Sequence, residues 1–140
     1  MYSMRVKSVM ERKKLLVAPP GTTVAKAAKL MVKKNVGAVM VVAEKRLVGI
    51  FTERDAVFRV IAAGRDPEAT TIGEVMTPDP VTVEPNEIFG RVLLAMHEQG
   101  FRHMPVVENG EPVGIGSSRS ALDPEMEEFT AETQRRLSLR

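Results

Sequence analysis

The sequence predicts an α/β (α+β) fold: two pseudo-symmetric β-α-β-β-α units packed sheet to sheet, with an extra helix at the C-terminus. Two observations support this prediction. The chain aligns with itself at an offset of 65 positions, so that residue 20 falls on residue 85. It also has only 140 residues, and a unit of about 60 residues buries too little surface to be comfortably stable alone. The two units are therefore expected to share one core.

The repeat covers residues 20–57, which align with residues 85–122 without a gap. A shorter match pairs Val9-Met10 with Val75-Met76. The identities fall mostly on apolar, Gly and Pro positions, which determine a fold, so they indicate an internal duplication. They are Pro20/Pro85, Met31/Met96, Val41/Val106, Val42/Val107, Val48/Val113, Gly49/Gly114, Ile50/Ile115, Arg54/Arg119 and Ala56/Ala121.

The first unit is expected to span residues 1–66. Thr23 is a candidate N-cap for a helix whose apolar positions recur with helical spacing. Buried strands are predicted over residues 38–42 and 47–51, and a closing helix over residues 53–63. Gly64 is expected to end that helix in a left-handed conformation. The helical positions are Val24, Ala27, Ala28 and Met31.

The second unit is expected over residues 67–123 and follows the same order. Asn86 is its candidate N-cap, strands are predicted over residues 104–107 and 112–116, and Asn109-Gly110 is a strong hairpin signal. Asp123-Pro124 then favours a fresh start, which assigns residues 124–140 to the C-terminal helix. The helical positions of the second unit are Phe89, Val92, Leu93 and Met96, and those of the C-terminal helix are Met126, Phe129, Thr133 and Leu137.

Composition narrows the function classes. The chain has no Cys, which excludes disulfides and a cysteine nucleophile and suits a reducing cytoplasm. Its formal net charge is only +2 and its aromatic content is 4%, so nucleic-acid binding is not expected. Neither a secretory signal nor a membrane span is expected, because the apolar runs are far shorter than about 20 residues.

Four segments carry a resemblance to the CBS domain family: residues 49–55 (GIFTERD), 114–120 (GIGSSRS), 74–78 (EVMTP) and 100–107 (GFRHMPVV). Residues 5–122 as a whole resemble a tandem CBS pair, or Bateman module. The resemblance implies regulatory binding of an adenine nucleotide in the clefts between the two units, and association into a homodimer. It also implies a stand-alone member that acts on an unknown client protein.

Residues 49–55 suggest how a nucleotide would be held. Gly49 allows backbone to approach closely, and Thr52 ends a strand where a helix begins, a place that suits an anion such as phosphate. Asp55 can accept hydrogen bonds from vicinal ribose hydroxyls. The resemblance adds Arg54, which lies within the same motif. The alternative is purely structural, because Thr-x-x-Asp before a helix also matches a capping box.

A second group lies at the start of a strand in the other unit. The resemblance implies that Arg102 and His103 reach the phosphates of the nucleotide whose ribose Asp55 holds. The alternative is an exposed Arg beside a satisfied His. At the repeat offset their counterparts are Gly37 and Ala38, and the counterpart of Asp55 is Ser120. The second cleft, with Ser120 facing Gly37 and Ala38, would therefore lack both polar ends, which predicts one site per chain.

Adenine needs a slot, and without Trp its walls are expected to be aliphatic or backbone. Core packing is the alternative for each of these residues. The candidate walls are Val17, Pro19, Gly37, Ala38 and Val39.

The predicted function is a ligand-sensing regulatory module without catalytic or metal-binding residues, and with no required cofactor. The expected ligand is AMP, ADP, ATP or an NADH-like molecule. The alternative is a dimeric interaction module that binds no nucleotide. Separately from this choice, the chain is expected to form a two-fold homodimer through apolar faces such as Val57, Val60 and Ile61, with Phe129 and Leu137 of the C-terminal helix extending the contact. An enzyme of the IMP dehydrogenase kind would need a cysteine nucleophile and a barrel of about 250 residues.

Overall fold

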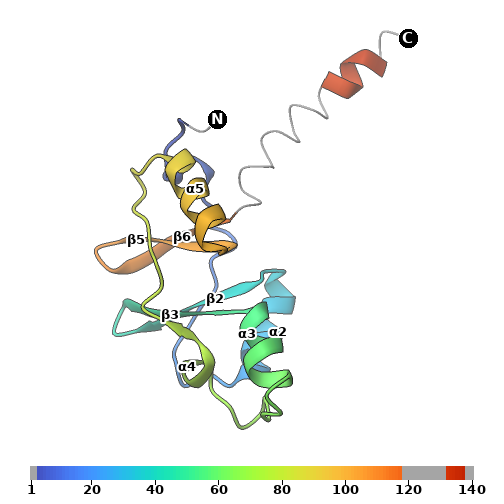
Figure 1. The fold of residues 1–140 in the computed structure, drawn as a ribbon, viewed down its shortest axis with the longest axis vertical. Coiled ribbons are helices and arrows are strands. Elements are labelled where there is room, and N and C mark those ends of the chain that lie inside the picture. The colour runs from blue at the N-terminus through green and yellow to red at the C-terminus, as the bar shows by residue number, and fades with distance from the viewer. Residues whose placement is uncertain (1–2, 118–131, 138–140) are drawn as a thin grey trace.

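The computed structural model of the chain describes residues 3–117 and 132–137, which include two units of mixed secondary structure (Figure 1). Each unit has a long helix, a β-hairpin and a short preceding helix. The first unit contains β1 (Val17–Ala18), α2 (Val24–Lys34), β2 (Ala38–Ala43), β3 (Arg46–Thr52), α3 (Glu53–Asp55) and the π-helix η1 (Ala56–Ile61). The remaining elements are α1 (Val6–Val9), α4 (Ile72–Val75), β4 (Thr77–Pro78), α5 (Phe89–Gln99), β5 (His103–Glu108) and β6 (Glu111–Ser117).

The sheets confirm the duplication. Four strands pair in the order β1-β2-β3-β4, and β5 pairs with β6 in a second sheet. The two hairpins, β2-β3 and β5-β6, are both antiparallel. The register of the first shifts between Val41 and Val42, and that of the second shifts between Val106 and Val107. Because these two positions are equivalent in the repeat, the irregularity belongs to the duplicated unit itself.

The hairpin turns show how two sequences reach one geometry. Asn109 and Gly110 have φ angles of 55° and 80°, as the predicted two-residue turn requires. Glu44 and Lys45 take φ angles of 52° and 65° in the first unit. These residues give no turn signal, so the strand pairing on either side holds them in the left-handed region.

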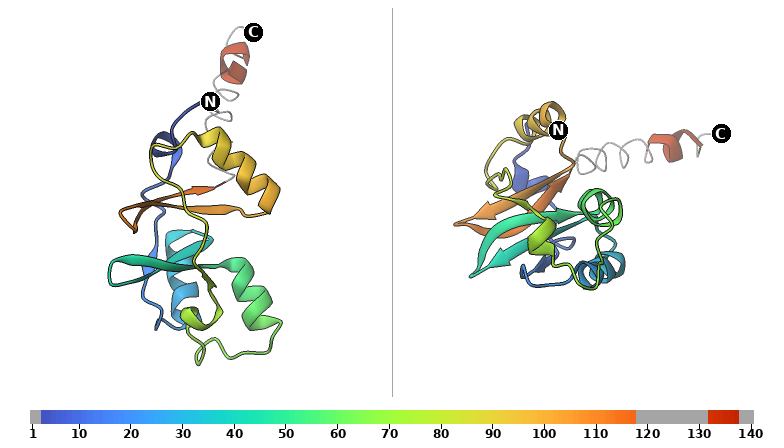
Figure 2. Two further views of the ribbon diagram at one scale, coloured as in Figure 1. Left: turned by 60° about the vertical axis from the view of Figure 1, so that its left-hand side comes forward. Right: turned by 60° about the horizontal axis from the view of Figure 1, so that its bottom comes forward.

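The two sheets stack face to face, and the long helices cover their outer faces (Figure 2). Residues of β2 alternate between the two sides. Val39 and Val41 point into the core under the helices, while Ala38 and Met40 join Ile50 and Ile115 in a separate buried cluster. Since Ile115 comes from β6, this cluster joins the two units.

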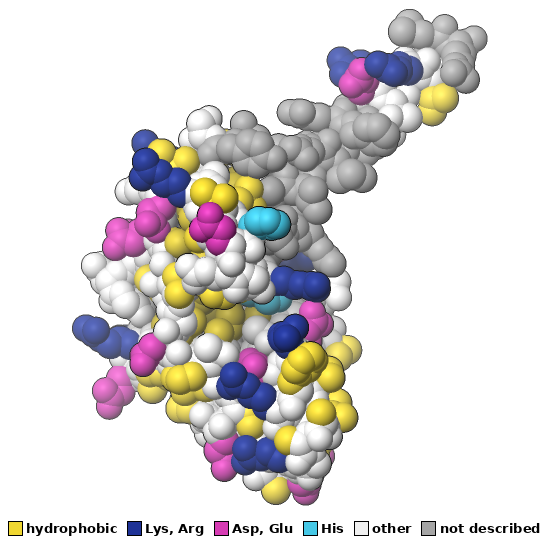
Figure 3. Space-filling model, in the orientation of Figure 1, with side chains coloured by type: hydrophobic (Ala, Val, Ile, Leu, Met, Phe, Trp, Pro, Cys, Tyr) yellow, Lys and Arg dark blue, Asp and Glu magenta, His cyan; other side chains and the backbone are white. Residues whose placement is uncertain are grey.

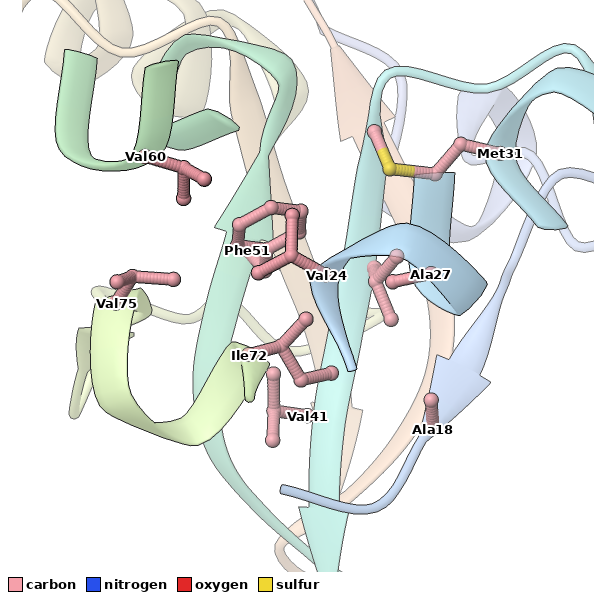
Figure 4. Close-up of a cluster of buried hydrophobic side chains, with 10 residues drawn as sticks. Ala18, Val24, Ala27, Met31, Val41, Phe51, Val60, Ile72 and Val75 are labelled. Carbon is pink, nitrogen blue, oxygen red and sulfur yellow. The ribbon is translucent and has the colours of Figure 1, made fainter. Parts of the chain in front are cut away.

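The core of the first unit forms around Phe51 of β3 (Figure 4). Val24 and Ala27 of α2 pack on one side of it, and Val60 of η1 lies in the same cluster. Ile72 and Val75 of α4 complete the cluster, although they follow the linker in sequence. Residues beyond the expected boundary at 66 are therefore part of the first unit's core.

The reverse exchange takes place at the N-terminus. Val6 and Met10 lie in the second unit's core with Phe89, Met104 and Val106. A Cβ added at Gly114 would lie 2.8 Å from the Met10 sulfur. One at Gly49 would overlap the Met76 sulfur in the same way. Each hairpin is thus covered by a segment that precedes the other unit in sequence.

Two predicted helix boundaries agree with the structure, and one differs. The Thr23 side chain accepts a hydrogen bond from Lys26 N at 3.2 Å, which confirms this N-cap. The closing helix ends near Gly64, whose φ is 70°. In the second unit, α5 ends at Gln99 with Gly100 as its C-cap, an end that was not predicted from the sequence. Asn86 is not the N-cap of α5, since Ile88 holds that position. The N-terminal segment pairs with this stretch through Phe89 N and Met4 O, and so keeps it extended.

Val60 lies in the core of the first unit and not on its surface. Val60 is 1% exposed and belongs to the core, so the prediction that it lies on an apolar outer face is wrong. Residues 132–137 are helical, and their side chains are exposed. Met126 and Phe129 lie outside the described residues. Within the described ranges, no helix has the length and apolar character needed to cross a membrane.

Candidate functional site

Thr52 and Asp55 form a complete capping box where β3 passes into α3. Asp55 N donates to Thr52 Oγ1 at 3.2 Å, and Thr52 N donates to Asp55 Oδ2 at 2.9 Å. The Thr52 hydroxyl also lies 3.2 Å from Oδ2. The structural alternative for this motif is therefore realised, and it commits one carboxylate oxygen.

The other carboxylate oxygen of Asp55 faces a different neighbour. Asp55 is 7% exposed, and its Oδ1 lies 3.6 Å from Arg59 Nε. That distance is too long for a hydrogen bond, although the charges still attract. Oδ1 therefore keeps acceptor capacity that the capping box does not use.

Three residues from two units converge at Gly37. Glu53 N donates to Gly37 O at 3.0 Å. A Cβ added at Gly37 would lie 3.0 Å from Glu53 Oε1 and 3.4 Å from His103 Nε2. His103 begins β5, so the start of α3 in the first unit faces the second unit here. The missing Cβ of Gly37 leaves the space in which these side chains meet.

This arrangement differs from the expectation that Gly37 and His103 belong to different clefts. Gly37 and Ala38 are the repeat counterparts of Arg102 and His103. Residues near an axis that relates two similar units lie close to their own counterparts. The repeat alignment identified the equivalent positions, but it could not show how near to that axis they lie.

The basic candidates lie at the surface. Arg54 lies over the ring of Phe58, with 4.3 Å from Cζ to the ring centroid, a cation–π geometry. Arg102 is exposed and His103 is half-buried. Lys and Arg side chains form a row down this face of the molecule (Figure 3). Acidic side chains lie among these basic ones in the same view.

The candidate adenine walls fall into two groups. Val17 and Pro19 are exposed, and Gly37 is half-buried. Ala38 is buried between the two sheets, and Val39 is fully buried in the first unit's core. The Val39 side chain is thus used in packing, and only its backbone could meet a ligand. Ser120, the counterpart of Asp55, lies outside the described residues.

Sequence reasoning overlooked two residues of this region. Glu53 reaches Gly37, and Arg59 faces Asp55. The pairing of Arg59 with Asp55 was predictable from the sequence, since the two residues are four positions apart and opposite charges at that spacing meet on one helix face. Among residues 3–117 and 132–137, no three acidic or His side chains are grouped so as to hold a metal ion.

The arrangement offers hydrogen-bond acceptors at Asp55 and Glu53, and the exposed cations Arg54 and Arg102 belong to the same set of candidates. Asp55 Oδ1 can accept from a hydroxyl, and the Gly37 backbone allows close approach. The imidazole of His103 can donate to an anion. Such a set suits binding and recognition of a polar small molecule.

Comparison with protein families gives two matches on the chain. The CBS domain matches residues 6–62 and again residues 72–123. A CBS domain-containing protein of Arabidopsis thaliana, CBSCBSPB3, is 39% identical over 103 residues, which is 73% of this chain. The alignment spans 18% of that relative, so the chain covers less than a fifth of its length.

Solved structures agree in fold over most of the chain. An uncharacterized conserved protein from Pyrococcus horikoshii superposes with a TM-score of 0.82 and 32% identity, covering 89% of this chain and 94% of its own. A CBS domain protein from Pyrobaculum aerophilum, complexed with AMP, has a TM-score of 0.76 and 27% identity, covering 84% and 89%. The CBS domain pair of protein MJ0100, in complex with 5′-methylthioadenosine and S-adenosyl-L-methionine, has a TM-score of 0.79 and 26% identity, covering 89% and 98%.

Proposed function

Because this chain belongs to the CBS domain family as a tandem pair of CBS domains, we propose that it is a regulatory module without catalytic activity. Its ligand contains adenosine and binds where the two units meet. The similar CBS proteins that hold AMP, or 5′-methylthioadenosine and S-adenosyl-L-methionine, support this ligand class. Adenosine is the part that these molecules share.

The convergence at Gly37 is the observation that carries the proposal. Gly37 and Glu53 of the first unit meet His103 of the second, next to the Thr52–Asp55 box. A ligand bound here touches both units at once. Such a ligand stabilises the relative placement of the two units that it contacts. The module can therefore respond to the ligand by a change in the population of that arrangement.

Each candidate residue has a distinct part in this proposal. Asp55 accepts from the ribose through Oδ1, since Oδ2 is engaged by Thr52. Arg102 and His103 face the phosphate side, and Arg102 supplies a permanent charge. The carboxylate of Glu53 lies in the same region, so it repels additional phosphates. The geometry therefore favours AMP or an uncharged adenosine derivative over ATP.

A thermal-shift panel tests the ligand class directly. The full chain is heated with AMP, ATP, NADH, 5′-methylthioadenosine or S-adenosyl-L-methionine, each over a concentration series. A ligand at a hundred times its Kd stabilises the folded state by about 2.7 kcal/mol. We expect AMP or 5′-methylthioadenosine to raise the melting temperature more than ATP. No shift with any of the five would contradict the proposal.

The second candidate function is a dimeric interaction module that binds no nucleotide. The engaged capping box at Asp55 favours it, and so do exposed apolar residues on the closing helix. Val57, Phe58 and Ile61 are 49%, 57% and 71% exposed. Closed two-fold dimers are the commonest assembly for such a surface.

Light scattering at micromolar concentration tests this surface. The wild-type chain should give the mass of a homodimer, and Ile61→Asp should give that of a monomer. Val81→Asp is the matched control, because Val81 is 50% exposed and belongs to the loop between β4 and α5, not to the closing helix. A wild-type monomer, or equal effects of both substitutions, would count against this interface.

We also propose that the module acts on a client protein and that it works in a reducing compartment. A module of this kind acts on a partner, since the binding site offers no chemistry of its own. The absence of Cys suits a reducing compartment such as the cytoplasm.

A further inference from the structure

Arg59 links the carboxylate of Asp55, the proposed partner of the ligand, to the segment that joins the two units. Its Nε lies 3.6 Å from Asp55 Oδ1. Its Nη1 donates to Val75 O at 3.3 Å and to Met76 O at 3.1 Å. Arginine is suited to this, because its planar fork presents several donors in fixed directions.

Val75 and Met76 stand at the end of α4, and the chain runs from there toward the second unit. Met76 packs against Gly49, and Thr77 and Pro78 pair with Ile50 and Gly49 as β4 beside β3. We define residues 75–78 as the connector. β3 ends at Thr52, so the connector contacts the strand that leads into the site as well as the helix that follows it.

We infer that Arg59 is a positioning residue, which orients the Asp55 carboxylate and couples occupancy of the site to the connector. The inference rests on the proposed function, since it takes Asp55 as the ligand's partner. A ribose hydroxyl that donates to Oδ1 draws negative charge away from Arg59. The hydrogen bonds from Arg59 to the Val75 and Met76 carbonyls then readjust, because one guanidinium serves both sides.

The distance of 3.6 Å between Arg59 Nε and Asp55 Oδ1 indicates whether losing Arg59 strengthens or weakens ligand binding. Arg59 does not occupy the acceptor site of Oδ1 as a hydrogen-bond donor would. Its positive charge attracts the carboxylate and fixes the direction of Oδ1. Removing Arg59 therefore weakens the ligand's hydrogen bond without releasing a competitor.

Calorimetry and NMR on the full chain test this inference, with AMP as the probe. Arg59→Gln should weaken AMP binding about three- to tenfold, between the effect of an exposed ion pair and that of a buried charged hydrogen bond. It should also reduce the AMP-induced amide shifts of Val75, Met76 and Thr77. Arg59→Lys keeps the charge and guards against a variant that fails to fold. Compared with Arg59→Gln, Arg59→Lys should recover more of the AMP affinity than of the AMP-induced amide shifts in the connector.

Arg65→Gln is the matched control. Arg65 also reaches α4, with its Nη2 3.5 Å from Glu74 Oε1, but it is not paired with Asp55. Its loss should leave AMP affinity and the connector shifts as in wild type. If wild type binds AMP and Arg59→Gln behaves like wild type, or Arg65→Gln like Arg59→Gln, the inference is overturned and the proposed function stands. If wild type binds none of the adenosine ligands, the proposed function fails as well.

Discussion

Single residues in this protein often serve the packing of a distant segment. Gly49 shows this most directly. The sequence marks it as a point of close backbone approach, and the approaching group is Met76 together with Thr77 O, which would lie 3.0 Å from an added Cβ. Gly49 therefore accommodates the connector rather than a ligand.

Gly49→Ala should destabilise the folded state by about 1–3 kcal/mol, the usual cost of inserting a methyl group into close-packed surroundings. Gly116→Ala is the matched control in β6. A Cβ there would lie 3.8 Å from Met104 O, an ordinary van der Waals distance. Urea unfolding measures both, and the control should stay within about 0.5 kcal/mol of wild type. Equal losses would show that the Met76 contact is not what requires glycine.

Asp55 combines a structural part with a proposed binding part. Its carboxylate closes the capping box at Thr52, so Asp55→Ala would remove a helix cap along with any ligand contact. Asp55→Asn keeps an oxygen acceptor for Thr52 and removes the charge. The asparagine variant is therefore the better probe of binding.

At the scale of an element, the short helix α4 depends on its first turn. Glu74 Oε2 accepts from Thr71 N at 2.7 Å and lies 3.2 Å from the Thr71 hydroxyl. The backbone N–H of Thr71 and then its hydroxyl hold the pKa of Glu74 below its usual value of 4.5, with a smaller attraction from Arg65. Because this pKa is lowered on folding, Glu74 stabilises the folded state above about pH 4.5.

Glu74→Gln should therefore be less stable than wild type at neutral pH, and the difference should shrink as the pH falls below 4.5. Thr71→Val keeps the backbone N–H that Glu74 accepts from. It should therefore reduce the pH dependence of the unfolding free energy less than Glu74→Gln does. Urea unfolding at several pH values gives both comparisons. A difference between Glu74→Gln and wild type that grows in acid would contradict this account of α4.

The elements also show what sequence could and could not predict. Both hairpins, both long helices and the sheet-to-sheet stacking follow from apolar spacing and the repeat. Asn86 was predicted as an N-cap and Val60 as a surface residue, and both were wrong for tertiary reasons. The N-terminal segment pairs with the backbone before α5, and α4 packs over η1 in the core. Neither contact leaves a local signal.

The candidate site was predictable in part. The motif around Thr52 and Asp55 was visible, and so were its two possible roles. The meeting of Glu53 and His103 at Gly37 was not, because it depends on how near these residues lie to the axis between the units. Arg59 could have been paired with Asp55 from its spacing, but its hydrogen bonds to Val75 and Met76 required the fold.

At the scale of the whole molecule, the two units exchange their leading segments. α4 completes the first unit's core, and α1 with Met10 completes the second. The units therefore cannot move apart without uncovering both cores. A ligand bound between the units therefore acts on a molecule in which α4 and the N-terminal segment already connect the two cores.

This exchange predicts how two fragments of similar length behave. Residues 11–78 contain every buried member of the first core, while residues 1–66 lack Ile72 and Val75. Each missing side chain contributes about 1.5–3 kcal/mol of burial, a large part of a small unit's stability. Circular dichroism during urea unfolding should show a cooperative transition for 11–78 and not for 1–66. A cooperative, well-dispersed monomer from 1–66 would contradict the exchange.

The central claim is that one adenosine-containing ligand binds per chain, through Asp55, where the two units meet. Calorimetry with AMP on the full chain, Asp55→Asn and Ser120→Ala tests it most directly. We expect a stoichiometry of about one, a loss of affinity of roughly ten- to a hundredfold for Asp55→Asn, and little change for Ser120→Ala. A stoichiometry of two, equal losses for the two variants, or an Asp55→Asn affinity equal to that of wild type would contradict the claim.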